Sequence, residues 1–178
     1  MSAYDDLPWI PRVVDFIRQA MAAEIPVLGH CLGGQFMALA MGGKVTKNPV
    51  KEIGWHEVEV ADHPVAVDWF GDLKRFTTFE WHGDTFSLPV GATRLLSSPA
   101  CEQQAFACGP HLALQCHVEM DPELIDAWCA TGDDEIAESR GPTVQSTAEI
   151  RRELGTRLAA LSAIADRLYD RWTAALAV

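Results

Sequence analysis

The chain has 178 residues, of which 48% are hydrophobic and 22% charged, and this composition predicts a globular protein with a substantial core. Its formal net charge of -11 argues against a nucleic acid or an anionic membrane as partner, because both require a positive face. No apolar run approaches the roughly 20 residues of a membrane span, the N-terminus lacks a signal-peptide pattern, and the cysteines follow no disulfide-scaffold spacing. We therefore expect reduced thiols and a cytoplasmic protein.

The first elements in chain order are a helix, a short strand and a second helix. Apolar residues recur at helical spacing from Trp9 to Ile25. The run from Pro26 to His30 is interpreted as a buried parallel strand, because helical patterns flank it. A second helix is expected from about Leu32 to Met41, where Gly42-Gly43 ends it.

Short strands and turns dominate the pattern from Lys44 to Cys116. Two polar segments, Asp62-His63-Pro64 and His82-Gly83-Asp84, are predicted as turns. The predicted strands are Ile53–Val60, Arg75–Trp81, Ala92–Ser97, Gln103–Cys108 and His111–Cys116.

The C-terminal part predicts helices separated by a polar segment. Asp121-Pro122 has the residues of a helix N-cap and first position. Ser146 and Glu149 form a capping-box pattern, and apolar residues then recur every three or four positions. We therefore predict an α/β domain over residues 1–130, a linker over 131–145 and one long amphipathic helix over 146–178.

The segment Gly29-His30-Cys31-Leu32-Gly33 places a cysteine on a tight turn between the expected strand and helix. This pattern is typical of a nucleophile elbow, with cysteine in place of serine. Gly29 and Gly33 are expected because a Cβ at either position would clash across the turn. A helix N-terminus also favours a thiolate through its dipole and its N–H groups. We therefore interpret Cys31 as a nucleophile rather than as a buried structural cysteine.

His117 and Glu119 are candidates for a catalytic base and the group that orients it. They follow the His111–Cys116 strand, and at this spacing on an extended segment both side chains point to the same side. Open α/β sheets bind ligands at the carboxyl ends of their strands. With Cys31, these residues supply a nucleophile, a base and an orienting acid.

Other polar residues are less specific. The segment Trp81-His82-Gly83-Asp84 either lines a pocket or forms an exposed turn. His30 is not assigned as the base, because adjacent residues of a strand face opposite ways. We predict no metal site and no other cofactor, since no standard zinc pattern fits the spacing of Cys108, His111, Cys116 and His117.

Four segments of the chain resemble motifs of class I (triad-type) glutamine amidotransferases. The resemblance covers about residues 1–130 and is nearest to free-standing proteins related to the amidotransferase half of GMP synthase. It implies a three-layer flavodoxin-like α/β domain with a mostly parallel central sheet. The matching segments are Pro26-Val27-Leu28-Gly29-His30-Cys31-Leu32-Gly33-Gly34-Gln35, Lys51-Glu52-Ile53-Gly54-Trp55, Trp81-His82-Gly83-Asp84-Thr85-Phe86 and Gln115-Cys116-His117-Val118-Glu119.

The resemblance implies hydrolysis of the glutamine side-chain amide through a thioester on Cys31. His117 would protonate the departing ammonia and then activate water, Glu119 would orient His117, and the Leu32 N–H would donate to the oxyanion. The ammonia would pass to an acceptor on a synthase partner chain. In some relatives the cleaved bond is instead the γ-glutamyl linkage of a peptide or conjugate. The residues implied to line the glutamine pocket are Gln35, Trp81, His82, Gly83 and Asp84.

Two features depart from the family pattern. Val118 stands where the family usually has proline. Residues 1–8 resemble the segment after a Gly-Gly loop, so we expect an N-terminally truncated domain that lacks this second oxyanion donor and the strands flanking the Cys31 strand. The alternative function is therefore a non-catalytic amidotransferase-like binding module. A cysteine-elbow hydrolase of the dienelactone type is disfavoured, because its acid precedes its histidine.

Overall fold

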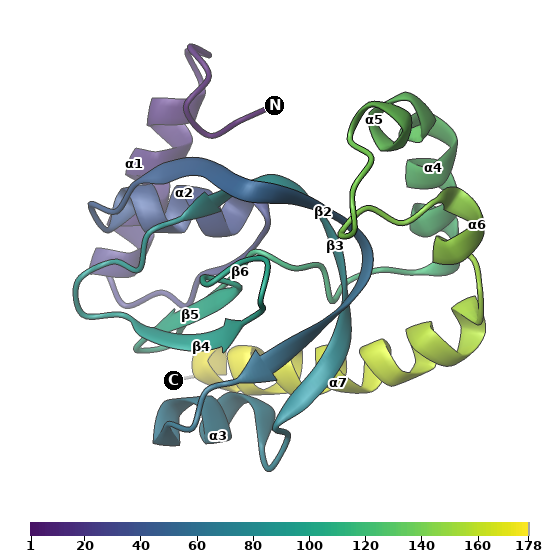
Figure 1. Ribbon diagram of the computed structural model, residues 1–178. Coiled ribbons are helices and arrows are strands. Elements are labelled where there is room, and N and C mark those ends of the chain that lie inside the picture. Colours follow the sequence, from purple (N-terminus) through teal and green to yellow (C-terminus); the bar gives the residue numbers. More distant parts are fainter. Residues whose placement is uncertain (178) are drawn as a thin grey trace.

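The structure of the protein, a computed structural model, describes residues 1–177 (Figure 1). No helix in this range is both long enough and apolar enough to cross a membrane. The elements are α1 (Ile10–Ala22), β1 (Leu28–His30), α2 (Leu32–Ala40), β2 (Val45–Val60), α3 (Pro64–Phe70), β3 (Arg75–Phe86), β4 (Thr93–Ser97), β5 (Ala105–Cys108), β6 (His111–Leu114), α4 (Pro122–Thr131), α5 (Asp133–Glu138), α6 (Thr147–Ile150), α7 (Leu154–Ala174) and a 3-10 turn, η1 (Ala175–Ala177).

Six strands form one curled, mixed sheet in the order β1-β6-β5-β4-β2-β3 (Figure 1). β1 and β6 run parallel, whereas the other four neighbouring pairs are antiparallel. The predicted α/β class is confirmed, but the expectation of a mostly parallel sheet is wrong for this chain. The short connections between β4, β5 and β6 contain no crossover helix, and parallel neighbours would require one.

β1 is an edge strand. Its residues pair with β6, with Gly29 opposite Ala113, and no strand of the described residues pairs with its other side. β1 is therefore paired on one side only within the described residues. The expectation that both flanking strands are missing is wrong, because β6 supplies one of them.

β2 and β3 form a long ribbon that bends across the molecule (Figure 1). Its register runs from Val45 opposite Phe86 to Glu59 opposite Arg75. The His82-Gly83-Asp84 segment, predicted as a turn, therefore lies within β3. Glycine and aspartate favour a turn locally, but pairing with β2 overrides that preference.

Two other polar segments contain helices. His63 caps α3 with its side chain and Pro64 takes the first helical position, so the segment predicted as a turn begins a helix. In the predicted linker, 131–145, α5 follows α4 directly, and an isolated bridge joins Val144 to Ile53 of β2. This segment therefore packs against the β2–β3 ribbon.

The single C-terminal helix predicted over 146–178 is two helices. Ser146 and Glu149 form the predicted capping box at the start of α6. The chain then turns at Glu153, whose φ of 56° is left-handed, before α7 begins, and position 178 lies outside the described residues. The long C-terminal helix is thus confirmed as α7, which packs against α3 and β3. Its side chains in the main core are Leu158, Leu161, Ala165 and Leu168.

Cys31 forms the strained turn between β1 and α2 that the sequence predicts. Its φ of 46° and ψ of -107° are a combination that non-glycine residues rarely adopt. A Cβ at Gly29 would lie 2.5 Å from the Gly33 carbonyl carbon, and a Cβ at Gly34 would lie 2.6 Å from the Leu114 carbonyl oxygen. A Cβ at Gly33 would meet no atom within 4 Å. The steric requirement predicted for Gly29 is confirmed, whereas that for Gly33 is wrong and belongs to Gly34, which faces β6.

We expect Gly34→Ala to lower the free energy of unfolding by about 1–3 kcal/mol, because its Cβ would overlap the backbone of β6. Gly33→Ala is the matched control in the same helical turn. It should be neutral or stabilising by about 0.5–1 kcal/mol, since alanine favours a helix more than glycine does. Urea unfolding followed by circular dichroism measures both values. An equal loss in the two variants would contradict the packing of α2 on β6.

Candidate active site

Cys31 lies at the N-terminus of α2, with its backbone fixed to the end of β6. Its N–H donates a hydrogen bond to the Leu114 carbonyl at 2.8 Å. Its side chain is half-buried, and the Gln115 Nε2 lies 3.5 Å from its sulfur. Leu32 is the first residue of α2, and an N–H at that position has no acceptor within the helix. The elbow therefore presents a sulfur atom and a backbone donor next to each other.

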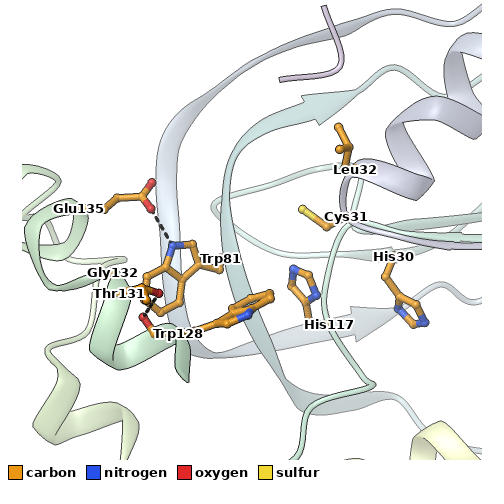
Figure 2. A pocket seen from close by; sticks show the side chains of 9 residues that line it. All are labelled: His30, Cys31, Leu32, Trp81, His117, Trp128, Thr131, Gly132 and Glu135. Atoms are coloured by element: carbon orange, nitrogen blue, oxygen red, sulfur yellow. Dashed lines mark hydrogen bonds between the residues drawn. The ribbon is translucent and has the colours of Figure 1, made fainter. Parts of the chain in front are cut away.

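His117 lies beside Cys31 (Figure 2), and the Glu119 carboxylate orients its ring. Its Nδ1 is 2.6 Å from Glu119 Oε1, and its own backbone N–H donates to the Phe79 carbonyl of β3 at 2.8 Å. Trp128 of α4 packs edge-to-face on the imidazole, with the ring centroids 4.8 Å apart. The ring is buried, and its Nε2 has no hydrogen-bond partner among the described residues. The structure thus brings the three predicted catalytic side chains together.

The charges around His117 favour an imidazolium. Burial disfavours its charged form, but the proximity of Cys31 and Glu119 outweighs burial and raises the pKa of His117 to about 10. Burial also disfavours the Glu119 carboxylate, yet the contact with His117 holds the pKa of this carboxyl below its usual value. The imidazolium is therefore stabilised between a sulfur and a carboxylate.

Gln35 is buried behind Cys31 and borders the site from within α2. Its Nε2 donates a hydrogen bond to Gln115 Oε1 at 3.2 Å. Because Gln115 in turn contacts the Cys31 sulfur, the two side-chain amides form a chain of contacts that ends at this sulfur. Gln115 is not predicted from the sequence. Its position directly after the strand that leads to His117 is the signal that points to it, and the chain bends at Gln115 and Cys116.

A polar cavity of about 560 Å³ opens beside Cys31. Trp81 borders it and donates through Nε1 to Glu135 Oε2 at 2.9 Å. The Asp84 carboxylate accepts hydrogen bonds from the hydroxyl groups of Ser2 and Tyr4. The predicted residues that border this cavity are Leu32, Gln35, Trp81, His82, Gly83 and Asp84.

The His82 imidazole is directed into the protein, with its side chain only 1% exposed. Its Nδ1 donates to the Asp84 carbonyl at 2.9 Å, and its Nε2 donates to Glu52 Oε2 at 3.1 Å. Burial opposes a charge on the ring, but contacts with Glu52 and Glu80 outweigh burial and raise the pKa of His82 well above its usual value. His82 is therefore a buried imidazolium that holds β2 and β3 together rather than a side chain open to the cavity.

One cluster of metal-type ligands occurs within residues 1–177. Ligand atoms of Glu52, His82 and Cys101 lie within 4.8 Å of one another. The His82 Nε2 proton is directed at Glu52, so the imidazolium supplies the positive charge that a cation would otherwise bring. Within this part of the chain the structure does not gather Cys108, His111, Cys116 and His117 into such a cluster.

His30 is a further residue of the site that the sequence does not predict. It borders a cavity with Cys31, and its Nδ1 lies 3.0 Å from Glu119 Oε2. Strand alternation would place His30 and Cys31 on opposite sides. That rule does not apply here, because the backbone of Cys31 leaves the extended conformation.

A second, mostly apolar cavity of about 460 Å³ is lined by the residues drawn in Figure 2, and Cys31 is among the residues that it shares with the polar cavity. His117, Trp81 and Trp128 border it, as does the junction of α4 and α5 at Gly132. A Cβ at Gly132 would overlap the Trp81 ring, so glycine lets the indole lie against this junction. The Cys31 sulfur therefore lies between a polar and an apolar cavity.

Comparisons with known proteins give a consistent result. The family model described as Glutamine amidotransferase class-I matches residues 5–128. The chain is 32% identical over 141 residues to the putative glutamine amidotransferase-like protein YfeJ of Salmonella typhimurium, covering 76% of this chain and 58% of that protein. It is 30% identical over 144 residues to the glutamine-hydrolyzing GMP synthase of Aeropyrum pernix, covering 75% and 27%. It is 28% identical over 131 residues to gamma-glutamyl peptidase 3 of Arabidopsis thaliana, covering 70% and 53%.

A solved structure agrees with these relatives. The glutamine amido transferase of Methylobacillus flagellatus has a TM-score of 0.96 and 44% identity, covering 99% of this chain and 73% of that one. The chain spans 58% or less of the length of the three curated relatives named above. The family model covers more than half of the present chain, from the segment before α1 to α4. The protein therefore belongs to the class I glutamine amidotransferase family.

Proposed function

We propose that the protein hydrolyses the side-chain amide of glutamine through a thioester on Cys31. The observation that carries this proposal is the buried His117, whose Nδ1 is held by Glu119 and whose Nε2 lacks a partner beside Cys31. A base in this position can move a proton between a sulfur and a leaving nitrogen. Membership of the class I glutamine amidotransferase family agrees with the same chemistry.

The proposed reaction has two halves. The Cys31 thiolate attacks the amide carbon and forms a C–S bond, while the carbonyl oxygen becomes an oxyanion that accepts from the Leu32 N–H. The His117 imidazolium gives its proton to the nitrogen, the C–N bond breaks, and ammonia leaves. The neutral His117 then takes a proton from water, whose oxygen attacks the thioester to give glutamate and the thiolate. Glu119 keeps the imidazole oriented throughout.

The polar cavity is the proposed site for the amino-acid head of the substrate. Its lining combines the carboxylate of Asp84 with the ammonium groups of Lys47 and Lys51. A glutamine head group carries one positive and one negative charge, so both kinds of partner are needed. We propose Gln35, Trp81, His82, Gly83 and Asp84 as the substrate-binding residues, with His82 acting through the backbone it fixes.

The ammonia is proposed to pass to a synthase partner chain. The 178 residues contain no Gly-x-x-x-x-Gly-Lys loop of the kind that cradles ATP phosphates. A matched relative of this chain is a glutamine-hydrolyzing GMP synthase, in which glutamine hydrolysis accompanies a synthase activity. We therefore place the acceptor outside these 178 residues.

A second candidate function is hydrolysis of a γ-glutamyl amide with an apolar leaving group. The observation that favours it is the apolar cavity bordered by His117, Trp81 and Trp128. Ammonia needs no such compartment, whereas an organic amine would bury apolar surface there. The similarity to gamma-glutamyl peptidase 3 agrees with this alternative.

Labelling with a diazoketone analogue of glutamine tests the nucleophile. We expect covalent label on Cys31, found by peptide mass spectrometry, with labelling and glutamate release abolished in Cys31→Ser. His117→Ala should slow labelling by at least about a hundredfold, because the general acid–base contribution is lost. Cys108→Ser is the matched control, since this half-exposed cysteine lies at the end of β5 outside the site. Label spread over all five cysteines would refute the assignment.

NMR titration of His117 tests the charge arrangement. The raised pKa of about 10 depends on Cys31 and Glu119, so we expect this pKa to fall by at least about one unit in Cys31→Ala. Since the folded pKa lies above the unfolded one, this group stabilises the fold below about pH 6.5, and that stabilisation is lost as the pH rises through the folded pKa. His63, an exposed histidine at α3, serves as the internal control. An unchanged His117 titration would show that the sulfur does not face this ring.

Substrate comparison separates the two candidate functions. We expect Trp128→Leu to reduce kcat/KM for γ-glutamyl anilide about tenfold more than for glutamine if the apolar cavity holds the leaving group. The substitution removes the contact between Trp128 and His117 in both reactions, so the ratio of the two kcat/KM values reports only the effect of the cavity on the leaving group. Steady-state kinetics with both substrates give this ratio. A ratio unchanged from wild type would remove the second candidate.

A further inference from the structure

Glu119 is contacted by two histidines, one at each carboxylate oxygen. His117 Nδ1 lies 2.6 Å from Oε1 in a short hydrogen bond, and His30 Nδ1 lies 3.0 Å from Oε2. The second contact has the distance of an ion pair but not the alignment of a hydrogen bond. The proposed reaction uses only the first contact, so the role of His30 requires its own explanation.

Tyr169 of α7 reaches the other side of the His30 ring. Its hydroxyl oxygen is 3.2 Å from His30 Nε2, and the two rings meet edge-to-face with centroids 6.1 Å apart. Both side chains are largely enclosed by protein. The C-terminal helix is thereby connected to Glu119 through a single intervening side chain.

The contacts determine where the protons lie. Glu119 is an acceptor, so Nδ1 of His30 carries the proton of a neutral ring, and Nε2 accepts from the Tyr169 hydroxyl. Burial lowers the pKa of His30, which agrees with a neutral ring. Burial and the charge of Glu119 raise the pKa of Tyr169 to about 12, so the hydroxyl keeps its proton. Three titratable groups face His30. Glu119 and His117 lie in the segment that follows β6, and Tyr169 lies on α7.

We propose that His30 and Tyr169 are positioning residues of the active site, with Tyr169 keeping His30 neutral and oriented and His30 restraining the outer oxygen of Glu119. This inference rests on the proposed hydrolytic function of Cys31. A carboxylate with His117 at one oxygen and His30 3.0 Å from the other has little room to rotate away from His117. A cationic His30 would compete with His117 for the same carboxylate, which is why a donor at Nε2 matters.

The pH dependence of Tyr169→Phe is the primary test. The variant keeps the ring but removes the donor, so His30 gains a proton more easily. We expect kcat to fall about fivefold near pH 6.5 with little change in KM, and the acid limb of the pH–rate profile to move up by about 0.5–1 pH unit. Thr173→Val, which removes a hydroxyl one turn along the exposed side of α7, should match wild type. A uniform loss at all pH values in Tyr169→Phe would overturn the proposal.

A double variant, compared with the two single variants, makes the test specific to His30. Glutamine at position 30 is polar but does not titrate, so His30→Gln/Tyr169→Phe should lack the shift of the acid limb seen in Tyr169→Phe. The effects on kcat should also be non-additive, because the two residues act as one unit. A shift that persists in the double variant would show that Tyr169 acts through another group and would overturn the proposal.

NMR provides a readout that does not depend on catalysis. We expect the titration midpoint of His30 to rise in Tyr169→Phe and to stay unchanged in Thr173→Val. If this shift occurs in a protein that hydrolyses neither glutamine nor γ-glutamyl anilide, the proposed function fails while the contact between Tyr169 and His30 stands. If activity is present and the His30 midpoint does not move, the positioning role fails while the proposed function stands.

Discussion

The hydrogen bond from the Cys31 N–H to the Leu114 carbonyl is the contact on which the site depends. It joins the elbow to the last residue of β6, and the close approach of Gly34 to the same carbonyl lets α2 begin there without a steric clash. The segment that follows β6 bends at Gln115 and Cys116 and carries Gln115, His117 and Glu119. Fixing the elbow to β6 therefore fixes the proposed nucleophile, Cys31, relative to Gln115 and to the proposed base, His117. A strained backbone at Cys31 persists because parallel pairing on one side and helix packing on the other leave it no alternative.

The opposite wall of the site is held by charge buried inside the β2–β3 ribbon. His82, Glu52 and Glu80 are almost completely enclosed, and isolated charges there would be costly. Pairing the imidazolium with Glu52, and its Nδ1 proton with the Asp84 carbonyl, satisfies both ring nitrogens. The Phe79 carbonyl of this ribbon in turn accepts a hydrogen bond from the His117 N–H. His82 therefore stabilises the ribbon from inside the protein, while Trp81, Gly83 and Asp84 form part of the surface of the polar cavity.

The sequence-based predictions are correct where neighbouring residues determine the structure, and they are wrong where contacts between distant segments determine it. The elbow, the capping box at Ser146 and the N-cap at Asp121 are local patterns, and the structure has all three. The turn predicted at His82 is wrong because pairing with β2, some 30 residues away, decides its conformation. Gly34 replaces Gly33 as the constrained glycine because only the position of β6 shows which one is crowded. The contacts of His30, Gln115 and Trp128 with the site likewise depend on chain segments that no local pattern connects.

The unpartnered Nε2 of His117 links this architecture to chemistry. No hydrogen bond joins Nε2 to another of the described residues, but the nearby Cys31 sulfur favours a proton on the ring and raises the pKa of His117. Here the rest of the ring is constrained by Glu119 and Trp128, so Nε2 cannot turn toward another acceptor. The remaining neighbours on that side are the Cys31 sulfur and the two cavities that meet beside it. In the proposed reaction, a substrate nitrogen that lies between the two cavities receives the Nε2 proton as its bond to the carbonyl carbon breaks, because an amide nitrogen becomes basic only at that stage. The direction of Nε2 therefore favours a substrate that places a leaving nitrogen next to the sulfur.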